Sequence, residues 1–277
     1  MKKFSALAIP ALAAIAFACA VPSPQRSTKI SRSWSSADVK SIVLETVNGT
    51  VQVSTGNPGQ VTMDASLVTN ERKGADQLLR MDVSDGTLHI VDRGSRKRFV
   101  FPFFHSGLQV HYVFTVPPKT DIALTNVNGK MRVDGIQGAA HLRSVNGTIT
   151  ISTAGAEVVA RTVNGSVRAE FMSEFRGARL STVNGPITVS LPPDASFDFD
   201  VSQVNGSFKS NVPMSVGRVS RGDVSGAVNG GQFPLELSTV NGSVSVQQRP
   251  GAVTPPTPPT VPALPPSPPP VESHSTR

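Results

Sequence analysis

Residues 162–165 read Thr-Val-Asn-Gly, and close variants of this tetrapeptide recur along most of the chain. The variants have their asparagines at Asn48, Asn128, Asn146, Asn164, Asn184, Asn205, Asn229 and Asn241. From Asn128 to Asn205 the asparagines follow one another at intervals of about 18–21 residues, and Asn241 lies about two such intervals beyond Asn205. A nearly constant step predicts a repeat architecture in which each unit is one supersecondary element.

Alignment of the units on Asn-Gly reveals four apolar columns. The column four residues before Asn contains Leu124, Leu142, Ala160, Leu180, Val201 and Leu237. The column immediately before Asn contains Val127, Val145, Val163, Val183, Val204 and Val240. The columns three and five residues after Asn contain Met131, Ile149, Val167, Ile187, Phe208 and Val244, then Val133, Ile151, Ala169, Val189, Ser210 and Val246. Alternation of these residues with Thr, Ser, Lys and Arg predicts a strand on each side of every Asn-Gly turn.

Two all-β arrangements contain such units, a row of hairpins and a solenoid in which each unit is one coil. Hairpins gain nothing from a constant unit length, whereas stacked coils need their columns in register, about 4.8 Å apart. Extra residues also collect at one corner, after the second strand, in 170–177 and 191–198. We therefore expect a β-solenoid with coils of about 18–21 residues.

The Asn-Gly pairs are interpreted as structural corners of the coils. We expect their side-chain amides to form a ladder at a buried corner, while Gly adopts the positive φ that the turn requires. The corner residues are Asn128, Gly129, Asn146, Gly147, Asn164, Gly165, Asn184, Gly185, Asn205, Gly206, Asn241 and Gly242. A row of calcium sites is the functional alternative, but it lacks repeated acidic partners.

Both ends of the chain differ in composition from the repeats. Residues 1–20, with Lys2 and Lys3 before an apolar run, are typical of a signal peptide, and Cys19 is a possible lipidation site. Residues 21–37 are expected to be a linker, 38–118 a less regular β-rich region, 119–248 the repeat solenoid and 249–277 a Pro-rich disordered tail. An exported location follows, in the periplasm, outer membrane or cell surface of a bacterium.

The segment 93–105 concentrates basic residues and phenylalanines. It is either a loop that contacts a membrane or partner, or a hairpin whose phenylalanines cover one end of the core. The formal net charge of +7 falls to +5 without Lys2 and Lys3, and the repeats are nearly neutral. Export and the lack of a basic repeat face argue against nucleic-acid binding, so any membrane contact is expected through this loop or a lipid anchor.

Catalytic and cofactor motifs are not evident. The five histidines show no metal-ligand spacing, and no phosphate loop, dinucleotide fingerprint or nucleophile elbow occurs. Asp194, Asp198 and Asp200 are the only clustered carboxylates that we considered for acid–base chemistry, and Asp198 and Asp200 should share one face of a strand. We assign no catalytic, cofactor or metal residue.

The Val-Asn-Gly repeats, together with Val116-Pro117-Pro118 and the export signal, resemble the bacterial putative-adhesin family of β-strand-repeat envelope proteins. The resemblance covers about residues 40–247 and implies a right-handed β-solenoid without established catalytic residues. The expected function is a non-enzymatic adhesin-like or scaffold surface for an envelope protein or polysaccharide. A polysaccharide-active β-helix enzyme and a subunit of an envelope stress-sensing system are the alternatives.

Overall fold

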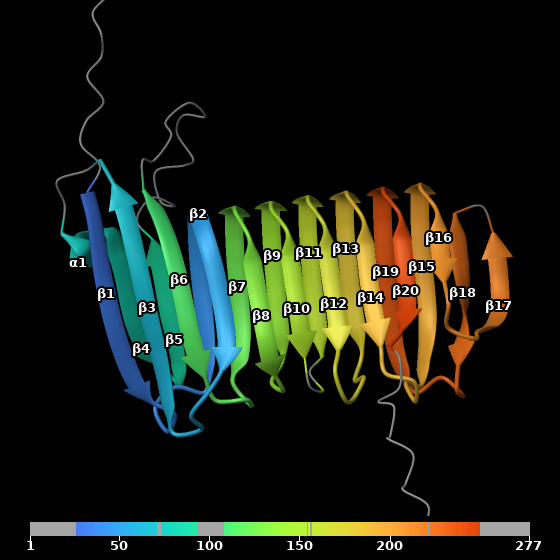
Figure 1. Ribbon diagram of the computed structural model, residues 1–277, viewed down its shortest axis with the longest axis horizontal. Coiled ribbons are helices and arrows are strands. Elements are labelled where there is room, and N and C mark those ends of the chain that lie inside the picture. Colours follow the sequence, from blue (N-terminus) through green and yellow to red (C-terminus); the bar gives the residue numbers. More distant parts are fainter. Residues whose placement is uncertain are drawn as a thin grey trace, which may run out of the picture.

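Strands dominate the computed structural model, which describes residues 26–70, 74–92, 108–153, 155, 157–220 and 222–249. Twenty strands are present there, with a single four-residue helix, α1 (Ala75–Leu78). The strands lie side by side along one long axis in two facing sheets (Figure 1). The predicted all-β class is therefore correct.

The two sheets have different strand orders, and both contain part of the long strand β2 (Ser41–Thr55). Sheet A consists, in spatial order, of β1 (Arg26–Ser35), β3 (Gln60–Thr69), β6 (Gln109–Val116), the second half of β2, β8 (Met131–Ile136), β10 (Ile149–Thr153), β12 (Val167–Phe171), β14 (Ile187–Leu191), β20 (Val244–Gln248) and β16 (Phe208–Ser210). Sheet B consists of β4 (Leu79–Ser84), β5 (Thr87–Asp92), the first half of β2, β7 (Asp121–Asn128), β9 (Ala140–Asn146), β11 (Val158–Asn164), β13 (Ala178–Asn184), β19 (Phe233–Asn241), β15 (Phe197–Asn205), β18 (Asp223–Val228) and β17 (Ser215–Ser220).

Within the repeats, each coil contributes one strand to each sheet, and equivalent strands pair in parallel. Asn164, for example, pairs with Asn146 on one side and with Asn184 on the other. Strand formation follows from alternation, because residues with even spacing point to one face of a sheet. In β9, Ala140, Leu142 and Ser144 are buried, whereas the residues between them are exposed. Each coil thereby buries a narrow row of small apolar side chains between the sheets.

Three of the four predicted apolar columns form this core. The columns that contain Leu142, Ile149 and Ile151 are buried along the stack, apart from Phe208 and Ser210 in the short strand β16. The column immediately before Asn was wrongly predicted to be apolar core: Val145, Val163, Val183, Val204 and Val240 are exposed, Val204 to 71%. The strand continues without interruption to Asn, so its period of two turns these valines outward.

The order of the coils departs from the order of the sequence at the C-terminal end. Strand β13 pairs with β19, and β15 pairs with the other side of β19. The coil β19–β20 thus lies between β13–β14 and β15–β16, as Figure 1 shows. Residues 235–246, although last in the sequence of the repeats, occupy an inner position, and the hairpin β17–β18 lies outside them.

The N-terminal region shares both sheets with the repeats. Strand β2 pairs with β7 and β8 of the first repeat and, on its other side, with β5 and β6. The predicted linker is wrong over residues 26–35, which form β1, antiparallel to β3. The signal peptide, Cys19, segment 93–105 and almost all of the Pro-rich tail lie outside the described residues.

Candidate binding face on sheet B

The four residues of the repeated tetrapeptide have four different roles at the corner of a coil. Its Thr points inward and is buried, as Thr162, Thr182 and Thr239 show. The Thr182 hydroxyl donates a hydrogen bond of 3.0 Å to the carbonyl oxygen of Gly165 in the neighbouring coil, and Thr162 and Thr239 make equivalent bonds of 3.3 Å. The sequence alignment missed this polar column, because it considered only apolar columns. Its hydroxyls satisfy carbonyl groups that would otherwise lose hydrogen bonds to water on burial.

The corner asparagines form one amide ladder of seven rungs. Each of the six asparagines after Asn48 donates from its Nδ2 to the Oδ1 of the asparagine in an adjacent coil, over 2.8–3.0 Å. The ladder runs through Asn48, Asn128, Asn146, Asn164, Asn184, Asn241 and Asn205, in the spatial order of the coils rather than that of the sequence. The prediction of a buried corner is wrong, because the six asparagines after Asn48 are exposed.

The corner glycines are required chiefly by close approach between coils. A Cβ at Gly165 would overlap the carbonyl oxygen of Gly147, and the same overlap would occur at each of the other five corner glycines. The φ angle was expected to explain these glycines, but among the six only Gly129 (132°) and Gly185 (149°) have a positive φ. The Gly165 N–H also donates to the carbonyl oxygen of Asn184 over 3.0 Å. The corner is therefore a device for stacking coils.

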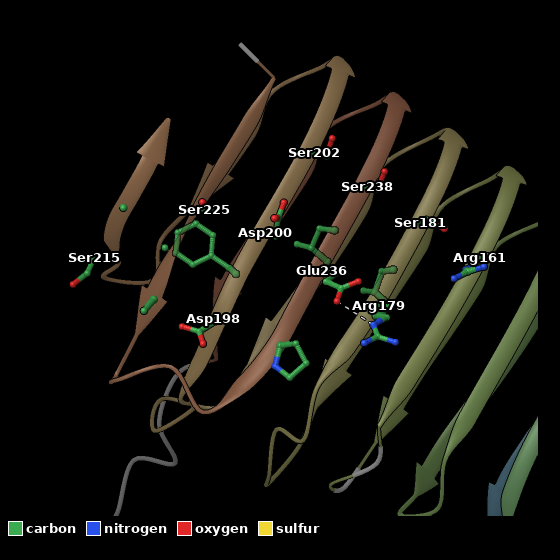
Figure 2. Close-up of a pocket in the computed structure, with 17 residues that line it drawn as sticks. Arg161, Arg179, Ser181, Asp198, Asp200, Ser202, Ser215, Ser225, Glu236 and Ser238 are labelled. Carbon is green, nitrogen blue, oxygen red and sulfur yellow. Dashed lines mark hydrogen bonds and ion pairs between the residues drawn. The ribbon is translucent and has the colours of Figure 1, made fainter. Parts of the chain in front are cut away.

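A groove of about 950 Å³ lies on the outer face of sheet B, across β11, β13, β19, β15, β18 and β17 (Figure 2). Hydroxyl groups line much of it, from Ser181, Ser202, Ser215, Ser225 and Ser238. Charged side chains complete the lining, from Arg161, Arg179, Asp198, Asp200 and Glu236. Hydrogen-bonding groups thus cover a broad open surface, and β19, which lies between β13 and β15, contributes Glu236 and Ser238 to it.

Opposite charges are segregated along this face. Arg179 on β13 and Glu236 on β19 are directly paired strand neighbours, and their side chains form an ion pair of 3.1 Å. The acidic residues Asp198 and Asp200 lie on β15, beyond Glu236, whereas Arg161 lies on β11, on the opposite side of Arg179 (Figure 2). Both members of the ion pair are about half exposed, with side-chain exposures of 50% and 52%, so the pair contributes little to stability.

The carboxylates considered for catalysis are placed as the alternation predicted. Asp198 and Asp200 are exposed on one face of β15, while Phe197 and Phe199 between and beside them are buried. Asp194 is exposed in the turn before the strand. A fourth carboxylate, Glu236, was overlooked, because its neighbour Asp200 on β15 is distant in the sequence although it is adjacent in sheet B.

A second polar constellation is buried near the N-terminal end. Asp92, the last residue of β5, accepts hydrogen bonds from the Thr46 hydroxyl (2.7 Å) and the Val47 N–H (3.0 Å). Tyr112 on β6 is fully buried, and its hydroxyl has no hydrogen-bond partner among the described residues. Burial raises the pKa of Tyr112 far above its ordinary value of 10.0, and the charge of Asp92 raises it further. Tyr112 belongs to the buried hydrophobic core, where its ring stacks on that of Phe114.

The described ranges contain no group of three His, Cys, Asp or Glu side chains that could hold a metal ion. His89 and His111 are exposed on their strands. Nor does that part of the chain contain a helix of sufficient length and apolar character to cross a membrane.

Residues 119–247 match the sequence profile of the Toastrack DUF4097 family. The repeat region is a Toastrack domain. The resemblance to β-strand-repeat proteins of the putative-adhesin type is thereby confirmed. The Toastrack match begins at the start of β7 and ends in β20, so β1–β6 precede it.

Several solved structures are similar to this chain at low sequence identity. A putative cell adhesion protein from Clostridium sporogenes has 11% identity and a TM-score of 0.49, over 81% of this chain and 100% of its own. A putative adhesin from Bacteroides fragilis has 13% identity and a TM-score of 0.38, over 80% and 97%. A putative lipid binding protein from Parabacteroides distasonis has 13% identity and a TM-score of 0.26, over 80% of this chain and 97% of its own. No curated protein matches the chain.

Proposed function

We propose that this Toastrack protein is a non-enzymatic binding protein of the bacterial cell envelope, and that the outer face of sheet B contacts another envelope protein or a polysaccharide. The groove supports this proposal, because five serines and five charged side chains present hydrogen-bonding groups over six adjacent strands. Such a lining suits a ligand with many polar groups and many weak contacts. The export signal expected in residues 1–20 supports the envelope location.

The distribution of the charged groups favours binding over catalysis. General acid–base chemistry requires two groups that converge on one bond from positions sheltered from water. Asp198 and Asp200 project from the same face of one strand, and both are exposed. Glu236, the carboxylate next to them, is engaged by Arg179. Turnover of any polysaccharide that Asp198→Asn abolishes would instead support the alternative of a polysaccharide-active enzyme.

The stack also supports the finer features of the proposed fold. Asn146 and Asn164 each stand 18 positions after the asparagine to which they donate, and Asn184 stands 20 positions after its own acceptor. This spacing is in keeping with coils of about 18–21 residues. Each coil leaves sheet B, passes through sheet A and returns beside its starting strand in parallel orientation. Crossovers of this kind are right-handed in almost all proteins, so we infer a right-handed solenoid.

A bulky substitution on each outer face tests where ligands bind. Ser238→Trp places an indole in the groove on sheet B, whereas Ser245→Trp places one on the outer face of sheet A in the same coil. Envelope extract from the source bacterium is passed over the immobilised wild-type protein and both variants. We expect specific proteins or glycans on the wild type and on Ser245→Trp, and their loss on Ser238→Trp. Equal retention by both variants would contradict the use of this face.

A further inference from the structure

The outer face of sheet B carries a row of arginines from three adjacent strands, Arg143 on β9, Arg161 on β11 and Arg179 on β13, hereafter the arginine row. Arg143 and Arg161 are direct neighbours in the parallel register. Both are exposed, and His141, also exposed, lies on the same face of β9. Strands in a sheet are about 4.8 Å apart, which is the backbone spacing of Arg143 and Arg161. Arg179 pairs with Val159 and is therefore offset from Arg161 by two residues along the strand.

Two of these cations have no acidic partner in the described part of the chain. Arg179 pairs with Glu236, but neither Arg143 nor Arg161 forms a salt bridge. Glu157, the acidic residue just before β11, is four residues from Arg161, or about 13 Å along an extended strand. Like charges directly opposite each other destabilise a sheet. An anion that lies across both side chains would offset the repulsion between Arg143 and Arg161.

The surroundings of the row define the shape of that anion. The neighbouring outward column contains the exposed valines Val145, Val163 and Val183, one per coil, along the same three strands. Arg143, Arg161 and the valines beside them therefore repeat together at the strand spacing, which is close to the length of one sugar unit. Glu236, Asp200 and Asp198 lie beyond Arg179 and repel an anion there, which limits the contact to the half of the face formed by β9, β11 and β13.

We propose that the arginine row binds an acidic polysaccharide whose chain runs across the strands, with a carboxylate or sulfate group at each arginine. This proposal rests on the proposed function and specifies its ligand class. Guanidinium groups bind carboxylates through two parallel N–H···O hydrogen bonds, which a single ammonium group does not reproduce. Each exposed contact is weak, so affinity arises from several contacts along one polymer chain.

The column that contains Arg143 and Arg161 supplies its own neutral replacement. Ser181, Ser238 and Ser202 occupy the equivalent position in the next three coils, so Arg143→Ser/Arg161→Ser retains a residue that the fold accepts there. A matched control is Arg168→Ser/Lys209→Ser, which removes two exposed cations from the outer face of sheet A, where Thr188 and Ser245 are the native residues between them. Arg161 and Arg168 belong to the same coil, so the pairs differ mainly in the face that they change.

The test measures binding of fluorescent polygalacturonate at low and physiological salt, with dextran as the neutral polymer and duplex DNA as another polyanion. We expect the wild type to bind polygalacturonate, with weaker binding at higher salt. The arginine double variant should lose about tenfold in affinity, while the control double variant loses less than about twofold. Denaturation midpoints of both variants should equal or exceed that of the wild type, because no favourable contact is removed.

Other outcomes overturn the proposal. Equal weakening in both double variants would show a general charge effect, and duplex DNA bound as tightly at the same arginines would show a site for polyanions in general. A further contrary result is a molecular mass by light scattering that differs between the arginine double variant and the wild type while the affinity for polygalacturonate is unchanged. That result would identify a second copy of the chain as the occupant, with its Asp198 and Asp200 facing the arginines. No polygalacturonate binding would refute the ligand class, and the extract experiment with Ser238→Trp would still decide the proposed function separately.

Discussion

Removal of one rung from the middle of the amide ladder tests whether the ladder stabilises the stack. Asn164 donates to Asn146 over 2.9 Å and accepts from Asn184 over 2.8 Å, so Asn164→Ala removes two hydrogen bonds. A hydrogen bond contributes about 0.5–1.5 kcal/mol net, and the groups left behind are exposed to water. We therefore expect the free energy of unfolding to fall by about 1–3 kcal/mol.

The end of the ladder provides the internal comparison. Asn205 donates to Asn241 over 3.0 Å and has no further rung beyond it, so Asn205→Ala removes one bond and should cost about 0.5–1.5 kcal/mol. Val163→Ala, an exposed change next to Asn164, is the control and should stay within about 0.5 kcal/mol. Urea denaturation followed by circular dichroism provides midpoints and slopes for all three variants. Equal midpoints for Asn164→Ala, Asn205→Ala and Val163→Ala would refute a stabilising ladder.

Three further predictions concern the corner, the core and the buried tyrosine. Gly165→Ala should destabilise by about 3 kcal/mol in the same denaturation assay, because its Cβ overlaps the Gly147 carbonyl, whereas Gly74→Ala, with open space around it, should have little effect; similar midpoints would contradict the close approach. Leu180→Ala should cost about 2–5 kcal/mol of core packing, against less than about 0.5 kcal/mol for the outward Val183→Ala, and a reversed order would mean that the strand faces are exchanged. Because the pKa of Tyr112 is raised on folding, its contribution to stability is complete below pH 10.0 and declines above it, by up to about 1.4 kcal/mol per pH unit. Tyr112→Phe should remove this decline, and since Tyr112 is the single tyrosine, tyrosinate absorbance should rise only as the protein unfolds; absorbance that rises near pH 10.0 in the folded protein would refute its burial.

The constant spacing of Asn-Gly was sufficient to predict coils, because stacking converts a sequence period into a spatial register. It also predicted three core columns, whose residues alternate on well-formed strands. It failed at Val163 and its equivalents, because hydrophobicity alone does not reveal where a strand ends and a corner begins. Side chains alternate between the two faces of a strand, so the valine three positions after Leu142 or Leu180 must point outward. The column alignment did not apply this rule.

The coil order could not be predicted from the repeat pattern. Every coil presents the same columns, so β19 fits beside β13 as well as β15 would, and local sequence does not discriminate between them. The groove on sheet B depends on this order, since it brings Arg179 and Glu236 together from positions 57 residues apart. Arg143 and Arg161, in contrast, lie on consecutive coils and could have been found by aligning the outward columns.

Disulfide formation between engineered cysteines tests the coil order, on which the groove and its charges depend. Ser181 and Ser238 are direct neighbours on β13 and β19, with Cα atoms about 4.8 Å apart, within the range that a disulfide spans. Ser181 and Ser202 lie two strands apart, at about 10 Å, although sequence order would make them neighbours. With Cys19 replaced by Ser, we expect Ser181→Cys/Ser238→Cys to crosslink on mild oxidation and Ser181→Cys/Ser202→Cys to remain reduced. A crosslink in the second pair and none in the first would show that the coils stack in sequence order, which contradicts the structure of this face.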